Sequence, residues 1–312
     1  MKHLQTLFFL LAFTVLPFLT QAQSPKSQRL VLLEQFTSST CGPCASANPT
    51  IVQRLQQNPD KFTAIFYHVG WPSPGNDPMY LHNTADNNAR VSYYSVNSVP
   101  RSVIDGNYFV GNPSGWSMTT INNRYAVPSP FEIDLQHTLN AAQDSIFLNM
   151  LIKVTADVSA SQLVAHNAVI EKLIHFTTAP GTNGEKDFHN VLKKLLPSAG
   201  GTGLPSNLSA GDYILIQTAW KLANVYNNSE LAAIGFVQSN ATKEVYQTAN
   251  SSTDPVSPLY ANDAEVLSIE DVAPQNCMGY ILPAVKVRNN GSNAMTSLNI
   301  KYRVNDGDIQ EY

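Results

Sequence analysis

Two cysteines stand three residues apart in the segment EQFTSSTCGPCASANP, and this spacing suits several kinds of chemistry. A C-x-x-C pair serves as a redox centre, as a structural disulfide or as half of a zinc site. No histidine follows Cys44, so the haem-attachment pattern C-x-x-C-H is absent, and no second ligand pair lies at a spacing that suits zinc. We therefore expect no metal and no cofactor, and Cys41 and Cys44 remain as a redox centre or a structural disulfide.

The elements on either side of the pair favour a redox role. Residues 30–36 (LVLLEQF) form a mostly apolar run of strand length, which predicts a strand covered on both faces. Residues 45–59 carry apolar side chains at helical spacing and end at Asn-Pro, where a helix stops. Cys41 would then lie at the N-terminus of a helix, where backbone N–H groups and the helix dipole lower a thiol pKa from about 8.5 toward 7 or below.

The chemistry that this position permits is thiol–disulfide exchange. Cys41 as a thiolate attacks a disulfide of the substrate, or in reverse the 41–44 disulfide is attacked, and Cys44 resolves the mixed disulfide. The alternative is a stable disulfide that only caps the helix in an oxidising compartment.

The order of the next elements predicts an α/β domain over residues 28–127. The first strand and helix are followed by a strand, a helix, two strands joined at an Asp-Gly turn, and a final helix. These elements are expected at residues 62–70, 81–96, 102–104, 107–110 and 114–124. Strand-helix-strand order implies a parallel pair with a right-handed crossover. The segment 71–80 contains three prolines and is expected to be a loop.

Residues 30–124 resemble the thioredoxin superfamily. The resemblance is carried by CGPC after a strand, by Pro49 five positions beyond the second cysteine, and by Val99-Pro100 before a hairpin with Asp-Gly. It implies that the Val99–Pro100 bond is cis, which is uncommon for X-Pro bonds, and that this bond lies beside the disulfide. It also implies substrate contacts from four residues: Val99, Pro100, Gly42 and Pro43.

The sequence departs from the thioredoxin pattern near the first cysteine. Thr40 stands where the family often has an aromatic residue, and Gln35 stands where thioredoxin has a buried aspartate. Glu34 lies beside that position but faces the opposite side of the strand, so it cannot replace the aspartate. Proton transfer to Cys44 is therefore unassigned. The loop at 71–78 resembles an insertion that would cover the site.

From residue 131 the pattern changes to alternating apolar and polar residues with turn-rich joints, which predicts an antiparallel β-sandwich over residues 131–250. The segment EKDFHNVLKKLLPSAGG (185–201) has apolar residues at helical spacing, so we expect a short helix there that bridges two strands. Proline-rich linkers are expected at 128–130 and 250–258.

The last part of the chain, residues 264–312, predicts an Ig-like β module with hairpin turns at Asn-Asn-Gly and Asn-Asp-Gly. The sequence stops where another strand is expected to begin, which indicates a truncated chain or a module that pairs with something absent. Cys277 lies in this part and has no partner by count.

The first residues predict export. Lys2 precedes an apolar run at 7–19, and small residues allow cleavage after Ala22, so residues 1–22 are expected to be a signal peptide. The run is shorter than the roughly 20 residues that span a bilayer, and we expect no transmembrane span. The expected location is the periplasm, the outer membrane or the extracellular space.

Composition limits the partners. Net charge is −4 and only 13% of residues are charged, so no broad field exists to hold nucleic acid or an anionic membrane. We expect protein thiols or disulfides of the cell envelope as partners, and the sequence names no electron donor. No Ser-His-Asp set or carboxylate pair indicates a hydrolase, and His68 is expected to be a polar residue at a strand end rather than a base.

The whole layout resembles the Omp28-related outer-membrane or secreted proteins of Bacteroidetes-type bacteria. Signal peptide, CGPC unit, sandwich and Ig-like tail follow in that order, and the segment FHNVLKKLLPSAGGTGL is the part associated with that group. The resemblance implies outer-membrane association as one address and leaves the reaction open. The leading hypothesis is disulfide exchange through Cys41 and Cys44; the alternative is a surface or binding protein in which the thioredoxin fold is a scaffold with a structural disulfide.

Overall fold

The structure is a computed structural model that describes residues 27–256, 258, 260–272 and 284–312. The expected signal peptide at 1–22 and the cysteine Cys277 lie outside the described residues.

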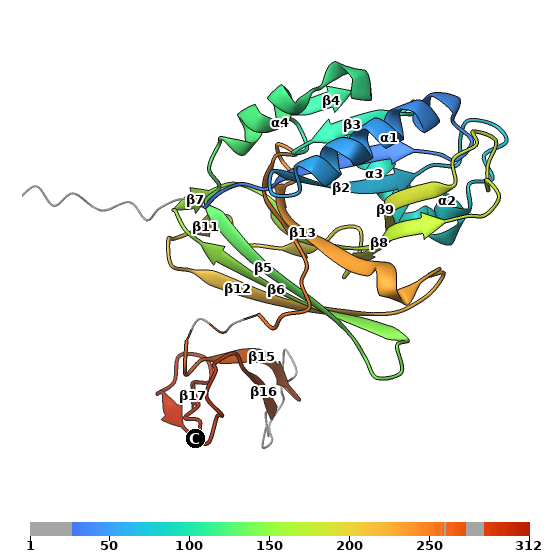
Figure 1. Cartoon of the computed structure of the whole chain (residues 1–312). Coiled ribbons are helices and arrows are strands. Elements are labelled where there is room, and N and C mark those ends of the chain that lie inside the picture. Colours follow the sequence, from blue (N-terminus) through green and yellow to red (C-terminus); the bar gives the residue numbers. More distant parts are fainter. Residues whose placement is uncertain (1–26, 257, 259, 273–283) are drawn as a thin grey trace, which may run out of the picture.

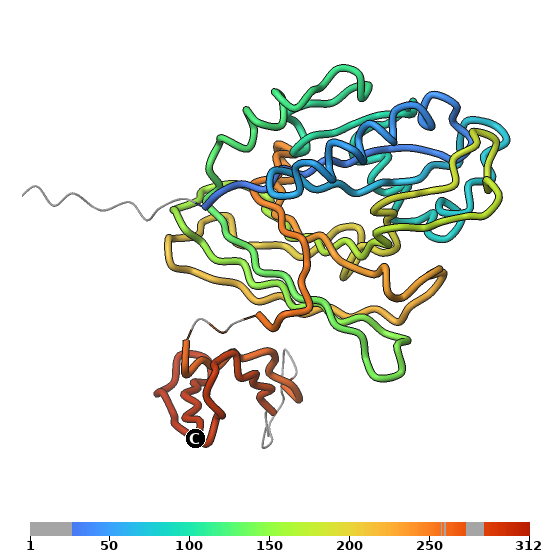
Figure 2. The backbone as a smooth tube through the Cα atoms, in the orientation of Figure 1, coloured from blue at the N-terminus to red at the C-terminus, as the bar shows by residue number. Residues whose placement is uncertain are grey.

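One large sheet organises the described chain (Figures 1 and 2). Its strand order is β14-β13-β8-β9-β2-β1-β3-β4, with β10 paired to β8. The strands of this sheet are β1 (Val31–Thr37), β2 (Phe62–His68), β3 (Arg101–Ile104), β4 (Phe109–Gly111), β8 (Leu163–His175), β9 (Asp187–Leu196), β10 (Thr202–Gly203), β13 (Leu231–Ser239) and β14 (Val245–Asn250). β1 and β2 are parallel, as the strand-helix-strand order predicts.

Helices cover both faces of the sheet around β1, which explains why that strand is apolar along most of its length. The helical elements are α1 (Gly42–Gln57), α2 (Pro78–His82), α3 (Thr84–Tyr94), α4 (Met118–Tyr125) and the single turns η1 (Pro113–Gly115) and η2 (Asn228–Glu230). Val31 and Leu33 pack with Ile51 of α1 and with Ile121 of α4. Leu32 and Phe36 point the other way and pack with Tyr94 of α3. α1 and α4 therefore lie on one face and α3 on the other (Figure 1).

A second sheet packs against one end of the large sheet and forms a sandwich with it. It has the order β12-β6-β5, from β5 (Phe131–Leu139), β6 (Ser145–Val154) and β12 (Tyr213–Lys221). Its inner side chains, such as Leu148 and Met150, share a core with Val169 of β8 and Val237 of β13. A small pair, β7 (Val158–Ser159) and β11 (Asn207–Leu208), closes the edge. The expected regions 28–127 and 131–250 thus share one continuous sheet.

The expected bridging helix at 185–201 is wrong, because this segment forms strand β9. β9 pairs with β8 along its length and meets β2 through the pair Phe66 and Val191. Both faces of β9 are covered, since Leu192 and Leu195 pack in one core cluster and Val191 in another, so its apolar residues need not alternate. Here Val191, Leu192 and Leu195 are buried in that way, and their spacing also matches a helix. Sheet pairing overrode the helical pattern.

The remaining differences are small. The helix expected at 81–96 is divided at Asn83, which ends α2 and caps the start of α3. In the described part of 264–312 the chain forms two short hairpin pairings. These are β15 (Ala264–Glu270) with β16 (Ala284–Asn289) and β17 (Lys301–Tyr302) with β18 (Gln310–Glu311).

Candidate functional site

The CGPC cysteines form a disulfide at the start of α1. The sulfurs of Cys41 and Cys44 are 2.05 Å apart, and the Cα atoms are 5.2 Å apart. Cys41 is the N-cap of α1, and its Sγ accepts a hydrogen bond from the backbone N–H of Cys44 at 3.1 Å. Gly42 and Pro43 are exposed, but the cysteines are only 1% and 0% exposed. A partner thiol can reach either sulfur only if the surrounding chain moves.

The loop at 71–77 lies against the residues that lead into the disulfide. The Thr40 hydroxyl donates to the Pro72 carbonyl at 2.8 Å, and the Ser39 N–H donates to Asp77 Oδ2 at 2.6 Å. This loop therefore contacts the site, as the sequence led us to expect. Thr40, which stands where the thioredoxin pattern often has an aromatic residue, donates one of these two hydrogen bonds.

A second segment, 177–186, lies against the same residues. The backbone N–H of Asn183 donates to Ser39 O at 3.0 Å, and its side-chain amide donates to the carbonyls of Ser38 and Cys41 at 3.1 and 3.2 Å. Gly181 approaches so closely that a Cβ there would lie 2.1 Å from Ser39 O. The sequence shows only a turn rich in Gly and Thr here, and nothing in it indicates that the segment packs against CGPC.

The Val99–Pro100 peptide bond is cis, so that expectation is confirmed. Pro100 directly precedes β3, and β3 pairs with β1 at Arg101 and Phe36. Pro100 is buried and therefore lies beside the end of β1 from which the Cys41 loop begins. The substrate contacts expected of Val99, Pro100, Gly42 and Pro43 stay predictions.

Glu34 and Gln35 face opposite sides of β1 and both are engaged. Gln35 Oε1 accepts from the Ser102 hydroxyl at 2.6 Å. The Glu34 carboxylate accepts from Arg90 at 2.6 Å and from the Tyr94 hydroxyl at 2.6 Å. Both side chains are fully buried. Glu34 is thus engaged on the α3 side of β1, and Gln35 is a neutral amide, so neither takes the place of the aspartate in the thioredoxin pattern.

His68 belongs to a buried pair that sequence reasoning missed. Its Nδ1 lies 2.7 Å from Asp77 Oδ2, and both side chains are at most 1% exposed. Burial by itself raises the pKa of Asp77, but the charge and hydrogen bond of His68, with two backbone N–H donors, hold it below the usual value. One of those donors is Ser39, so the pair is tied to the CGPC loop. No signal in the sequence links His68 with Asp77 across the proline-rich loop.

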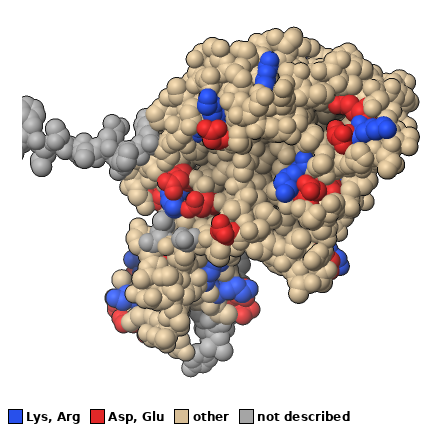
Figure 3. Space-filling view, viewed as in Figure 1, with Lys and Arg blue, Asp and Glu red and all other residues tan. Residues whose placement is uncertain are grey.

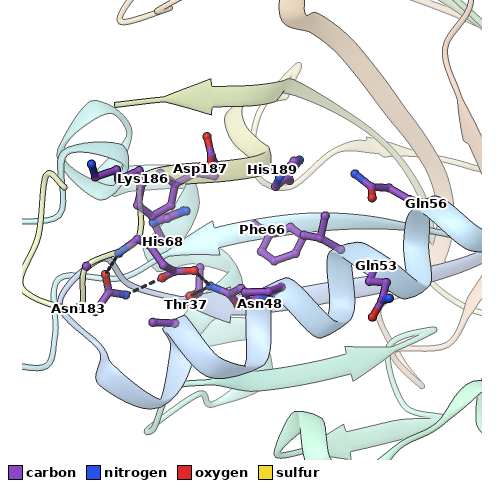
Figure 4. Close-up of a pocket in the computed structure, with 16 residues that line it drawn as sticks. Thr37, Asn48, Gln53, Gln56, Phe66, His68, Asn183, Lys186, Asp187 and His189 are labelled. Atoms are coloured by element: carbon purple, nitrogen blue, oxygen red, sulfur yellow. Dashed lines mark hydrogen bonds between the residues drawn. The ribbon is translucent and has the colours of Figure 1, made fainter. Parts of the chain in front are cut away.

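A cleft of about 580 Å³ runs along α1 beside this network (Figure 4). It is lined by α1, by the end of β2 and by residues 183–189. His189 lines it, whereas His175 pairs with Asp187 at 2.6 Å on the exposed surface. Neither Cys41 nor Cys44 lines this cleft, so it is distinct from the disulfide.

The surface carries few charges. On the face in Figure 3, Lys and Arg lie in small groups mixed with Asp and Glu, without a field of one sign. Within the residues that the structure describes, no group of three or more His, Cys, Asp or Glu is placed to hold a metal ion. The helices of the described ranges are all too short or too polar to cross a membrane.

No protein-family model and no curated protein matches this chain. Among solved structures, the chain is similar to HBP35 of Porphyromonas gingivalis, with 17% identity and a TM-score of 0.60 over 83% of this chain and 85% of that one. A protein of Agrobacterium tumefaciens matches with 11% identity and a TM-score of 0.44 over 74% and 97% of the two chains. A domain of the outer membrane lipoprotein Omp28 from Porphyromonas gingivalis matches with 15% identity and a TM-score of 0.29 over 42% and 94%. The first similarity shows a shared fold; the other two carry no argument at those TM-scores.

Proposed function

We propose that this chain is an exported, thioredoxin-like protein of the cell envelope that exchanges disulfides with protein thiols through Cys41 and Cys44. The observation that carries the proposal is the position of Cys41 as the N-cap of α1, where its sulfur accepts the Cys44 N–H. When the pair is reduced, that N–H and the helix dipole stabilise a thiolate on Cys41. A cysteine with a stabilised thiolate is the form that attacks disulfides.

The exchange is a two-step transfer. A partner thiolate attacks Sγ of Cys41, the 41–44 bond breaks, and the electron pair leaves on Cys44, which takes a proton. A second partner thiolate then attacks the partner sulfur of the mixed disulfide and releases Cys41 as a thiolate. The partner dithiol is oxidised to a disulfide and the protein disulfide is reduced. With an electron donor of the envelope the same steps run in reverse.

The location is part of the proposal and rests on the leader-like residues 1–22. The thioredoxin-like assignment of the α/β part rests on the parallel β1–β2 pair, α1 after CGPC, and Pro100 before β3. The layout as a whole supports an Omp28-type envelope protein with an Ig-like tail.

A second candidate is favoured by one observation, the burial of both sulfurs. In that case the disulfide is structural, the thioredoxin-like part is a scaffold, and the β domains bind an envelope partner. Structural disulfides are inert because attacking thiolates cannot reach them.

Trapping with a Cys44→Ser variant separates the two candidates. Without Cys44 the mixed disulfide on Cys41 cannot be resolved. We therefore expect envelope proteins to accumulate as disulfide-linked adducts, which are preserved under non-reducing conditions and which mass spectrometry assigns to Cys41. The matched control is Cys41→Ser, which keeps the remaining thiol buried and should trap almost nothing. If Cys44→Ser traps no more protein than this control, the exchange proposal is wrong.

A further inference from the structure

The cleft beside α1 is lined by the carboxylate of Glu185 and by the aromatic ring of Phe66, which Figure 4 labels. It is lined by Asn48, Gln53 and Gln56 of α1, by Phe66 and His68 of β2, and by Glu185. In Figure 4, Phe66 lies in the middle of the cleft and Gln56 extends toward it from α1. A volume of about 580 Å³ is within the range of pockets that take small ligands or one long side chain.

Glu185 is half-buried and is held by neutral groups. Its Oε1 accepts from the Asn48 amide at 2.9 Å, and its Oε2 accepts from the Asn183 amide at 2.5 Å. No Lys, Arg or His nitrogen of the described residues lies within 4.0 Å of this carboxylate. Burial raises the pKa of Glu185, and the hydrogen bonds from the two amides offset only part of this effect. Glu185 is therefore a partly desolvated carboxylate that lacks a cation partner among the described residues.

Asn48 offers a second acceptor at the same place. Its amide nitrogen donates to Glu185 and to the Thr37 hydroxyl at 2.9 Å each. An ionised carboxylate only accepts hydrogen bonds, so the nitrogen and oxygen of the Asn48 amide cannot exchange places. Oδ1 is therefore the acceptor that is left over. Asn48 is 7% exposed, and its Oδ1 has no hydrogen-bond partner in the described part of the chain. A carboxylate and an amide oxygen therefore lie together, short of a donor.

The cations nearest to Glu185 are engaged or turned away. His68 is paired with Asp77 at 2.7 Å; it lowers the pKa of Glu185 less than the two amides do, and the charge of Asp77 opposes this effect. Lys186 also lines the cleft, but its side chain points away from Phe66 in Figure 4. His189 lies farther along the wall on β9.

We propose that this cleft binds a primary ammonium or guanidinium group, with Glu185 as its counter-ion and the alkyl stem of the ligand lying over Phe66. The donors of such a group match the carboxylate and amide oxygens, and the aromatic face of Phe66 suits both an alkyl chain and a cation. The side-chain amides of Gln53 and Gln56 can bond the polar remainder of the ligand. A Lys or Arg side chain of a polypeptide and a free small amine share this chemistry. The proposal does not depend on disulfide exchange.

Calorimetric titration of the full chain with three probes tests this site. The probes are agmatine, butylamine and the capped tripeptide acetyl-Gly-Arg-Gly-amide, and N-butylacetamide is the uncharged control. We expect saturable binding of at least one cationic probe and none of the control. Glu185→Gln keeps the shape but removes the charge, and should weaken that binding by about tenfold or more. The matched control Asp60→Asn removes an exposed carboxylate that does not line the cleft and should change it by less than about twofold.

The outcomes separate the ligand sources and the two proposals. Tighter binding of the tripeptide than of agmatine supports a polypeptide partner, and the reverse order supports a small amine. Binding that is unchanged in the double variant Cys41→Ser, Cys44→Ser supports a site independent of the disulfide. If no cationic probe saturates the wild-type chain, if N-butylacetamide binds as well as butylamine, or if Glu185→Gln binds like wild type, the proposal is overturned. The comparison of butylamine with N-butylacetamide needs no variant, so it tests the requirement for a positive charge even if Glu185→Gln does not fold.

Discussion

His166 is a buried histidine near the start of β8. It is 2% exposed, its ring stacks on Phe236 with centroids 4.8 Å apart, and both ring nitrogens lack a partner among the described residues. Burial, with a smaller contribution from the charge of Arg90, lowers the pKa of His166 to about 3. The folded protein therefore holds this histidine neutral across the physiological range.

That depressed pKa predicts a loss of stability in acid. An unfolded histidine titrates near pH 6.5, so protons favour the unfolded chain as pH falls from about 6.5 toward 3. The contribution of neutral His166 to the free energy of unfolding is complete above that window and is lost within it. We expect His166→Leu to lose less stability than wild type between pH 7 and pH 4, by a few kcal/mol.

Urea unfolding at several pH values measures this difference. Asp77 also has a lowered pKa, but it adds the same acid sensitivity to both proteins and cancels in the comparison. Equal slopes of unfolding free energy against pH for wild type and His166→Leu would show that His166 is not the titrating group.

Among the helices and strands, the sequence predicted those whose pattern of apolar residues matches the faces that neighbouring elements cover. The apolar run before CGPC became β1, and the segment after it became α1, because both are covered as their patterns require. β9 could not be predicted, since Val191, Leu192 and Leu195 fit a helix and a doubly covered strand equally well. Hydrogen bonds between residues more than 120 positions apart, such as that from Asn183 to the Cys41 carbonyl, form only when the whole sheet has assembled. Such bonds leave no local pattern in the sequence.

We expect the segment 177–186 to limit the access of thiols to the disulfide. Asn183→Ala removes the side-chain bonds to the carbonyls of Ser38 and Cys41, so local opening of the segment becomes easier. We expect dithiothreitol to reduce the 41–44 disulfide severalfold faster in this variant, as measured by alkylation and mass spectrometry.

Thr182→Ala is the matched control, because Thr182 is the exposed neighbour in the same segment. Its reduction rate should equal that of wild type. An Asn183→Ala rate no faster than the Thr182→Ala rate would mean that other parts of the chain limit access to Cys41.

At the scale of the whole molecule, the α/β part and the sandwich form a joint structure. Phe36 and Tyr67 of the α/β part share a core with Ala168, Ile170 and Phe236 of the later strands. Buried polar contacts also cross between the two, including Arg90 with Gln238 at 3.2 Å and Arg29 with the Val245 carbonyl at 2.6 Å. The linker at 128–130 was visible in the sequence, but the pairing that joins the two regions was not.

This joint structure predicts one cooperative unit. A fragment of residues 27–127 would expose the face that packs on β8 and β13, and we expect it to show no cooperative thermal transition by circular dichroism. A fragment of residues 27–256 should unfold in a single transition. Cooperative melting of the 27–127 fragment would mean that the α/β part is an independent domain.

Equilibration of the disulfide with a glutathione redox buffer tests whether Cys41 and Cys44 form a working exchange centre. Alkylation and mass spectrometry give the reduced fraction, and circular dichroism follows the fold. We predict a reversible two-electron couple more oxidising than about −300 mV, with the same fold in both states. A pair that stays oxidised down to potentials below about −300 mV, or a chain that unfolds when the pair is reduced, would contradict the claim and identify a structural disulfide.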